Sequence, residues 1–261
     1  MKASLLNITT SPLDERDIVI ETIINPELPI QSNLDYRKDM PRVWDQGEDG
    51  PCSSFAVAAI KAWQEKMNYG LDEELSQYFI YNIRPNKSIK GINPRVTMRL
   101  LQAWGIPRKK IYNNKSIPDV NKLSKKILND AKNHRILGYA AVNTVEGLKG
   151  SLIKNGPAYI AMPVYNDGAT FWKGGRGDKM LGGHALVVVG YNKTGFIIRN
   201  SWGSDWNGDG HTIYPYVDFG MHLEIWTSID DTSSTKQIPT STPKPKRNGI
   251  LNLFRKIFGK N

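Results

Sequence analysis

The segment DQGEDGPCSSFA runs from Asp45 to Ala56. It holds the only cysteine of the chain, Cys52, directly after a turn at Gly50-Pro51. Apolar residues follow the cysteine at helical spacing, from Phe55 to Trp63. Cys52 is therefore predicted to lie at a helix N-terminus, where the helix dipole stabilises a thiolate. The alternative is inert packing, because a free cysteine is often buried.

A nucleophilic thiol needs a base, and the base needs a group that orients it. Among four histidines, His184 has suitable surroundings, since it opens the apolar run in the segment GGHALVVVGY, residues 182–191. The next predicted strand, GFIIRN, ends on Asn200. A hairpin through residues 192–194 brings His184 and Asn200 to one end of a sheet. This placement favours a Cys-His-Asn arrangement in which the asparagine holds the imidazole tautomer. Gln46, just upstream of Cys52, carries an amide that can donate to an oxyanion.

These three blocks resemble those of papain/cathepsin-type cysteine peptidases. The QGEDGPCSSF, HALVVVGY and NSWGSDWN segments begin at Gln46, His184 and Asn200. The histidine and asparagine follow Cys52 by 132 and 148 residues, within the separation of roughly 130–150 residues typical of that family. The resemblance covers about residues 34–229 and implies an α+β papain-like fold, with a helical lobe, an antiparallel sheet lobe and a cleft between them.

The resemblance also implies roles for individual residues. Cys52 would attack a peptide carbonyl, His184 would move the proton, and Asn200 would orient the imidazole. Gln46 would hold the oxyanion, and Trp202 would shield the His184–Asn200 hydrogen bond. Separately from the resemblance, Gly182 and Gly183 directly before His184 suggest a roomy, uncharged non-primed substrate pocket. No cofactor and no metal are expected, and the substrate is a protein or peptide.

Several positions depart from the family pattern. Asp49 stands where the family has a disulfide cysteine, and a single cysteine excludes the usual disulfides. Pro51 and Ser53 replace the residues that normally flank the nucleophile, and Asn207 replaces the last glycine of the third block. Two alternatives therefore remain beside hydrolysis: a transferase or ligase that uses the same acyl-enzyme, and a catalytically silent binding scaffold.

The spacing of apolar residues and the helix start and stop signals predict the helices and strands around these blocks. We expect helices from Cys52 to about Tyr69 and over residues 74–81, 94–104, 118–133 and 145–154. We expect strands over residues 135–142, 158–164, 184–191 and 195–200, with a long loop over residues 166–183. Residues 205–210 resemble the start of an EF-hand, but the twelfth position is Tyr216 rather than glutamate, so calcium is not expected.

The two ends of the chain differ from its middle. Residues 1–33 are predicted to form an extended arm that packs on the surface, with packing beside the cleft as the alternative. Residues 230–249 have the composition of a flexible linker. Residues 250–261 form a basic amphipathic pattern that fits an anionic membrane surface or a partner protein, although folding back or disorder fits equally.

Composition limits the remaining function classes. The net charge is +10, but residues 232–261 contain seven lysines and arginines and no acidic residue. The basic character therefore belongs to the tail, and no specific nucleic-acid partner is expected. The sequence contains no signal-peptide core and no run long enough to span a bilayer. With one cysteine, this favours a reducing compartment such as the cytoplasm. The oligomeric state is left open.

Overall fold

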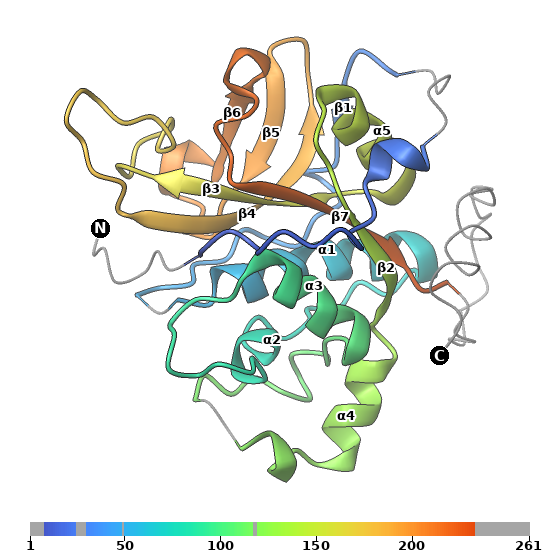
Figure 1. The fold of residues 1–261 in the computed structure, drawn as a ribbon. Coiled ribbons are helices and arrows are strands. Elements are labelled where there is room, and N and C mark those ends of the chain that lie inside the picture. The colour runs from blue at the N-terminus through green and yellow to red at the C-terminus, as the bar shows by residue number, and fades with distance from the viewer. Residues whose placement is uncertain (1–7, 25–29, 49, 117–118, 233–261) are drawn as a thin grey trace.

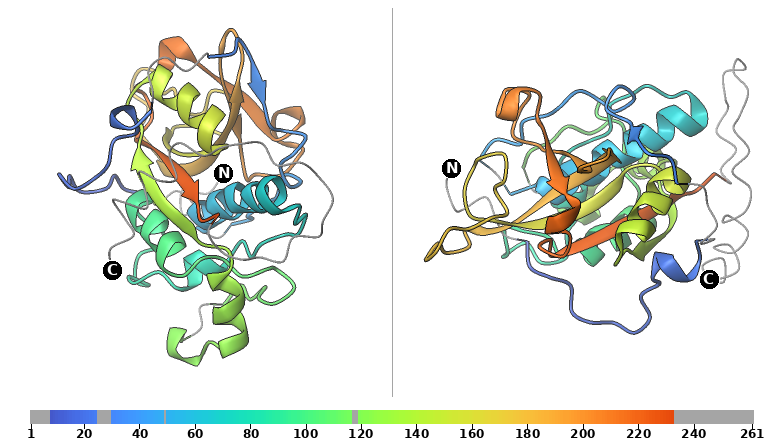
Figure 2. Two further views of the ribbon diagram at one scale, coloured as in Figure 1. Left: turned by 90° about the vertical axis from the view of Figure 1, so that its right-hand side faces the viewer. Right: turned by 90° about the horizontal axis from the view of Figure 1, so that it is seen from above.

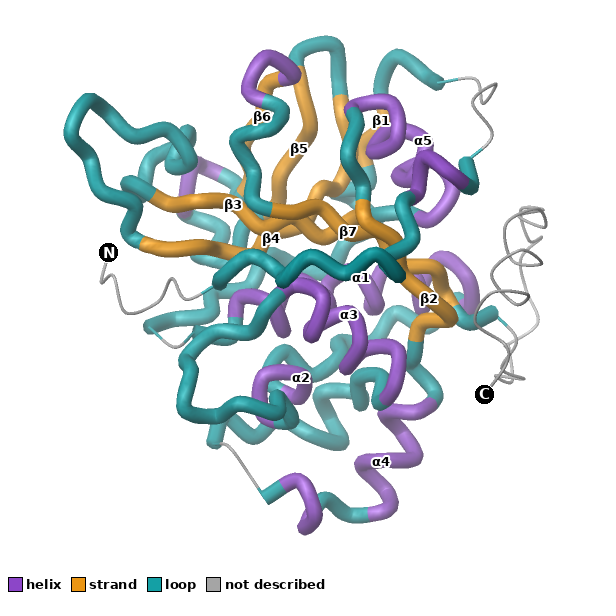
Figure 3. The backbone as a smooth tube through the Cα atoms, in the orientation of Figure 1, coloured by secondary structure: helices purple, strands orange, loops and turns teal. Residues whose placement is uncertain are grey.

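The computed structural model describes residues 8–24, 30–48, 50–116 and 119–232. An antiparallel sheet and a group of helices form two parts that meet along one boundary (Figure 1). Strands gather in one part and most helices in the other when the chain is coloured by secondary structure (Figure 3). This α+β arrangement is the predicted two-lobe fold.

The helical part is built around the helix that begins at the cysteine, α1 (Cys52–Tyr69). It ends as predicted at Gly70, which adopts a left-handed conformation with φ 67°. The other helices of this part are α2 (Phe79–Asn82), α3 (Pro94–Ala103) and α4 (Lys125–Lys132). Asn93 caps α3 by accepting from the backbone N–H of Val96. The α1 helix contacts β4 of the sheet as well as α2 and α3, and the left view of Figure 2 shows it below the strands.

In the part of the chain that the structure describes, the sheet has seven strands, ordered β2-β7-β3-β4-β5-β6, with β1 paired to β4. Their bounds are β1 (Leu34–Asp35), β2 (Ile136–Ala141), β3 (Ala158–Val164), β4 (Gly182–Tyr191), β5 (Gly195–Arg199), β6 (His211–Pro215) and β7 (Glu224–Asp230). β4 and β5 form the predicted antiparallel hairpin, with Tyr191 opposite Phe196. The hairpin places the beginning of β4 and the residues after β5 at the same end of the sheet.

Both faces of the central strands are buried, which explains why β3 and β4 are apolar almost throughout. In β4, Ala185 and Val187 belong to the core cluster that contains α1. Leu186 and Val188 belong to a second cluster with α5 (Val145–Asn155). The side-chain alternation of a strand therefore divides one apolar run between two cores.

The described residues of the N-terminal segment, from Ile8 on, are more deeply packed than the predicted surface arm. Ile8 is 3% exposed and Ile20 is fully buried. The arm runs along the boundary between the sheet and the helices (Figure 1). Near Ile20, the Glu21 carboxylate accepts the backbone N–H groups of Asn143 and Thr144, each at 2.8 Å. The arm is thus fastened to the segment that starts α5.

Two predicted helices differ in the structure. The pattern over residues 118–133 breaks at Ser124, whose hydroxyl accepts from the backbone N–H of Ile127 and caps α4, after a short 3-10 turn at Val120–Lys122. The segment 74–81 becomes helical only at Phe79, because Leu75 pairs with Arg108 and the Ser76 N–H donates to Pro107. The other helix and strand predictions agree with the structure to within two residues.

No helix within the described ranges is long and apolar enough to cross a membrane. Most of the predicted linker, from residue 233 on, and all of the amphipathic tail lie outside the described residues. The flexible linker and the docking of the tail therefore remain predictions.

Candidate active site

Cys52 is the first residue of α1 and is 1% exposed. Its helix begins directly after Pro51, whose carbonyl accepts the N–H of Phe55. Cys52 belongs to the same buried hydrophobic cluster as Ala185 and Val187 of β4. Ala185 directly follows His184, so this contact places the cysteine against the start of β4.

His184 and Asn200 meet at the end of the β4–β5 hairpin, as predicted. The His184 Nε2 lies 2.8 Å from the Asn200 Oδ1. Because an amide oxygen only accepts, Nε2 carries the proton and the neutral ring presents an unprotonated Nδ1. The Nδ1 is buried and has no hydrogen-bond partner among the described residues. The asparagine thus fixes the tautomer that leaves Nδ1 able to accept a proton.

Trp202 covers the His184 ring. The two rings are stacked, with centroids 4.7 Å apart and planes 14° apart. Phe171 packs edge-on against Trp202 at 5.4 Å and lies 6.4 Å from the His184 ring. Phe171 comes from the long loop before β4, and nothing in the sequence around it pointed to this position. Together these aromatic groups limit how the imidazole can turn.

Gln46 is held beside this cluster by Ser201. The Ser201 hydroxyl donates to the Gln46 Oε1 at 2.6 Å, and the Gln46 backbone N–H donates to the Ser201 carbonyl at 2.9 Å. Because Oε1 is engaged, the orientation of the side-chain amide is defined. Ser201 belongs to the third block, but the sequence contained no signal that it pairs with Gln46.

Burial determines the protonation states in this structure. It raises the pKa of the Cys52 thiol to about 11, an effect partly opposed by the N–H of Ala185. It also lowers the pKa of His184 to about 4, although the hydrogen bond to Asn200 acts in the opposite direction. A neutral thiol and a neutral imidazole are therefore favoured here, in place of the thiolate predicted from the helix N-terminus.

The N-terminal arm lies beside the predicted substrate-pocket residues. The Ile8 N–H donates to the Gly183 carbonyl at 3.2 Å. A Cβ at Gly183 would lie 2.3 Å from the Ile8 carbonyl oxygen, so the glycine allows the arm to approach this closely. Gly182 precedes this contact at the start of β4 and is partly exposed. Gly183 therefore lies under the arm, at a position next to His184.

Ser11 extends this contact to both lobes. Its hydroxyl lies 2.8 Å from the Asn93 Oδ1 beside α3 and 2.7 Å from the Glu224 Oε2 on β7. The Asn93 side-chain amide donates to the Thr10 carbonyl at 3.0 Å. The arm thus connects the helical part to the sheet across their boundary.

Ser53, next to the nucleophile, has a partner that no pattern in the sequence indicates. Its hydroxyl lies 3.0 Å from the hydroxyl of Tyr159 on β3 and donates to the Ile92 carbonyl at 3.3 Å. A small residue beside the nucleophile therefore faces a large aromatic residue from the sheet. Within the described ranges, no group of three or more His, Cys, Asp or Glu side chains is arranged to hold a metal ion.

The chain is similar in sequence to known cysteine proteases. Residues 30–218 match the family model described as "Papain family cysteine protease". A cathepsin B-like protein of Giardia intestinalis is 26% identical over 205 residues, which are 70% of this chain and 67% of that protein. Papain of Carica papaya is 24% identical over 213 residues, which cover 78% of this chain and 59% of papain.

Solved structures support the same fold. Xylellain, a cysteine protease from Xylella fastidiosa, aligns with a TM-score of 0.74 at 24% identity, covering 88% of this chain and 97% of xylellain. Procathepsin L 3 of Tenebrio molitor aligns with a TM-score of 0.67 at 18% identity, covering 87% of this chain and 77% of procathepsin L 3. The family match extends over most of the chain, from before β1 to the end of the short turn after β6. The chain therefore belongs to the papain family of cysteine proteases.

Proposed function

We propose that this chain hydrolyses peptide bonds through Cys52, His184 and Asn200, with Gln46 as an oxyanion donor. The observation that carries the proposal is the 2.8 Å contact between His184 Nε2 and Asn200 Oδ1. It leaves Nδ1 as the proton acceptor on the residue that precedes Ala185, which packs in the same hydrophobic cluster as Cys52. We also propose that the peptidase unit spans residues 34–229, with a protein or peptide as substrate.

The first half of the reaction forms the acyl-enzyme. His184 Nδ1 takes the thiol proton as the Cys52 sulfur attacks the scissile carbonyl carbon. The resulting oxyanion accepts hydrogen bonds from the Gln46 side-chain amide and the Cys52 backbone N–H. The imidazolium then gives its proton to the leaving amine, the C–N bond breaks, and a thioester remains. Asn200 and Trp202 keep the imidazole in place during both transfers.

The second half restores the enzyme. Water enters after the amine product leaves, and His184 Nδ1 takes a proton from it as it attacks the thioester carbonyl. The C–S bond breaks, the acid product leaves, and the proton returns to the Cys52 sulfur. Because burial favours the neutral pair, we propose that the thiolate forms as the substrate binds rather than persisting at rest.

Turnover of a fluorogenic peptide by four proteins tests the proposal. We expect Cys52→Ala and His184→Ala to lose at least a thousandfold in kcat/KM. His222→Ala is the matched control, because burial also lowers the pKa of His222 to about 4 but it lies outside the proposed triad. Equal activity of wild type and Cys52→Ala would exclude the proposed mechanism.

Product analysis distinguishes hydrolysis from the two alternatives. With an added amine nucleophile, a hydrolase still releases mainly the free acid, whereas a transferase or ligase forms mainly the new amide. A silent scaffold forms neither product. We propose hydrolysis, since the relatives that match over most of this chain carry the names of cysteine proteinases.

A further inference from the structure

Arg199 is a buried cation at the end of β5. Its side chain is 4% exposed. Its Nη2 donates to the Arg42 carbonyl at 2.6 Å, and its guanidinium carbon lies 5.5 Å from the Trp44 ring centre. In the part of the chain that the structure describes, the Arg199 side chain has no other hydrogen-bond, ion-pair or ring partner. One of five N–H donors is therefore satisfied by a hydrogen bond within the protein.

The neighbouring charges do not neutralise Arg199. Glu74 reaches the Trp44 indole at 3.1 Å, but its carboxylate is already engaged by Arg42 at 3.0 Å and by Lys109 at 2.7 Å. On the neighbouring strand, His211 of β6 lies opposite Arg199 of β5 in the antiparallel register. His211 is no counter-ion, and Arg199 contributes to the lowering of its pKa, for which burial is the largest cause.

Burial without a counter-charge is unfavourable for a guanidinium group. The effect is visible in the residue itself, since burial alone lowers the pKa of Arg199 to about 10. Arginine nevertheless remains protonated near neutral pH. A positive charge in this position therefore favours the binding of a negative group from solution.

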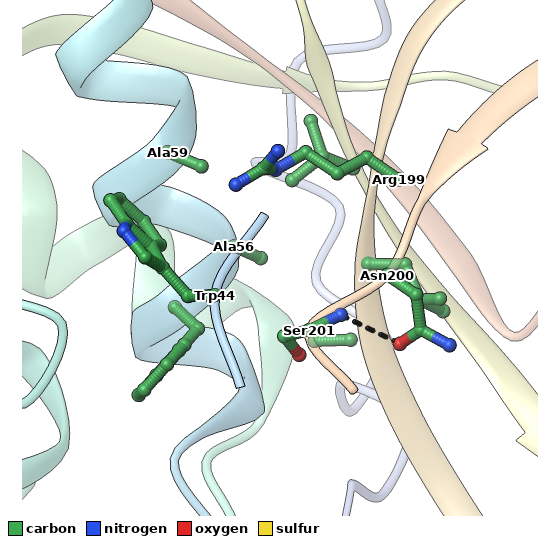
Figure 4. A pocket seen from close by; sticks show the side chains of 10 residues that line it. Trp44, Ala56, Ala59, Arg199, Asn200 and Ser201 are labelled. Carbon is green, nitrogen blue, oxygen red and sulfur yellow. Dashed lines mark hydrogen bonds between the residues drawn. The ribbon is translucent and has the colours of Figure 1, made fainter. Parts of the chain in front are cut away.

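A small cavity adjoins the guanidinium. It lies between α1 and the strands β4 and β5, and the Arg199 side chain points across it towards Ala59 and Trp44 (Figure 4). Its lining contains no acidic residue, and Arg199 is the only charged side chain in it. The cavity has a volume of about 10 Å³, which is room for about one water molecule or one monatomic anion.

We propose that a halide ion, such as chloride or bromide, binds in this cavity against the Arg199 guanidinium. The ion supplies the missing negative charge and accepts the donors that Arg42 leaves unused. Asn200 and Ser201 line the same cavity, so the ion also fixes the end of β5 from which both residues project. A positioning effect on His184 and Gln46 follows, and this second part rests on the proposed function, whereas binding itself does not.

Thermal unfolding of the full chain tests binding. The protein is prepared in sodium gluconate and titrated with sodium chloride or bromide at constant ionic strength. At ten times the dissociation constant, a ligand of the folded state raises the folded-to-unfolded ratio about elevenfold. For a protein of this size, this corresponds to a Tm rise of about 3–5 °C. The rise should saturate, be absent in Arg199→Met, and persist in Arg176→Met, which removes an exposed arginine.

Diffraction from wild-type crystals grown in bromide gives a test that does not depend on how Arg199→Met folds. An anomalous bromide peak next to the guanidinium is expected. A water molecule in the cavity, with bromide only on the surface, would overturn the proposal, as would a Tm response that Arg199→Met retains.

Peptide turnover separates this inference from the proposed function. We expect chloride to raise kcat/KM several-fold in wild type and not in Arg199→Met. A saturable Tm rise in a protein without peptidase activity would overturn the proposed function and leave the halide site in place. Binding with unchanged kcat/KM in an active enzyme would overturn the positioning effect.

Discussion

At the residue scale, the Ser201 hydroxyl sets the orientation of Gln46, because it donates to the amide oxygen at 2.6 Å. Removing an oxyanion donor typically costs about 10²–10³ in kcat, and we expect this loss for Gln46→Ala. Ser201→Ala should lose about five- to tenfold, since it removes one orienting hydrogen bond of about 1 kcal/mol. Steady-state kinetics on a peptide substrate measures both.

The double variant shows whether the two residues act as a unit. Gln46→Ala with Ser201→Ala should be no slower than Gln46→Ala alone. Ser204→Ala, at an exposed serine of the same segment, should retain full activity. Full activity of Ser201→Ala would contradict an orienting role for the hydroxyl.

His184 should make stability sensitive to acid. Burial lowers its pKa to about 4 from an ordinary value of 6.5, so the unfolded chain binds a proton more readily between these values. Acidification in this window therefore favours unfolding, and the effect levels off below the folded pKa. Between pH 7 and 4.5, wild type should lose about 2 kcal/mol more than His184→Gln.

Urea unfolding at the two pH values measures this difference. His222, with a pKa also lowered to about 4, is present in both proteins and cancels in the comparison. Equal losses in wild type and His184→Gln would show that the imidazole is not buried in neutral form.

At the element scale, two helix ends that both contain glycine should respond differently to alanine. Gly156, after α5, has φ 85°, and a Cβ there would lie 2.0 Å from the Trp63 ring. Gly70, after α1, has φ 67° with nothing within 4 Å of the added Cβ. Gly70→Ala should cost about 1 kcal/mol of backbone strain. Gly156→Ala adds a clash with a buried ring and should cost about 3 kcal/mol or more.

Chemical denaturation of both variants provides the measurement. Both glycines have a positive φ, but Gly70 lies in the αL region, whereas ψ −156° places Gly156 outside it, so the backbone cost at Gly156 adds to the clash with the ring. Equal costs would mean that Trp63 can move away from Gly156.

The local sequence predicts a helix or strand correctly where its apolar spacing and its end signals agree. The α1 helix was predictable because its apolar spacing and the stop at Gly70 agree. The segment 118–133 was not, because its apolar spacing continues across Ser124, where a side chain competes for the backbone. Leu75 and Ser76 stay out of a helix because of partners more than 30 residues away, which periodicity does not reveal.

The same distinction holds for the site. Cys52, His184 and Asn200 stand in contiguous blocks, so sequence could bring them together through one hairpin and one helix. The Ser201–Gln46 bond and the packing of Phe171 on Trp202 join separate segments, and no local pattern encodes them. The low pKa of His184 is likewise a product of burial in the assembled core.

At the scale of the whole molecule, the arm links the two lobes across their boundary. The short apolar runs of residues 1–33 predict packing on the surface. The structure instead buries Ile8 in the same hydrophobic cluster as Cys52. The arm's placement depends on Gly183, Asn93 and Glu224, which are far from it in sequence.

Displacing the arm should increase activity. Ile8→Asp would bury a carboxylate without a partner, so we expect the arm to leave the boundary. The peptide-cleavage rate and the rate of Cys52 alkylation at pH 7 should then rise about tenfold or more, because the arm contacts Gly183 next to His184 and its departure exposes this side of the site. Leu13→Asp is the matched control, since Leu13 is fully exposed. Identical rates in both variants and wild type would mean that the arm does not restrict access.

The most direct test of the central claim is covalent labelling by a peptide vinyl sulfone, read by intact mass and peptide mapping. A single adduct on Cys52 of wild type is expected, faster in Ile8→Asp, absent in Cys52→Ala and much reduced in His184→Ala. A folded Ile8→Asp protein that remains unlabelled, or an adduct rate unaffected by His184→Ala, would contradict a nucleophile at Cys52 activated by His184.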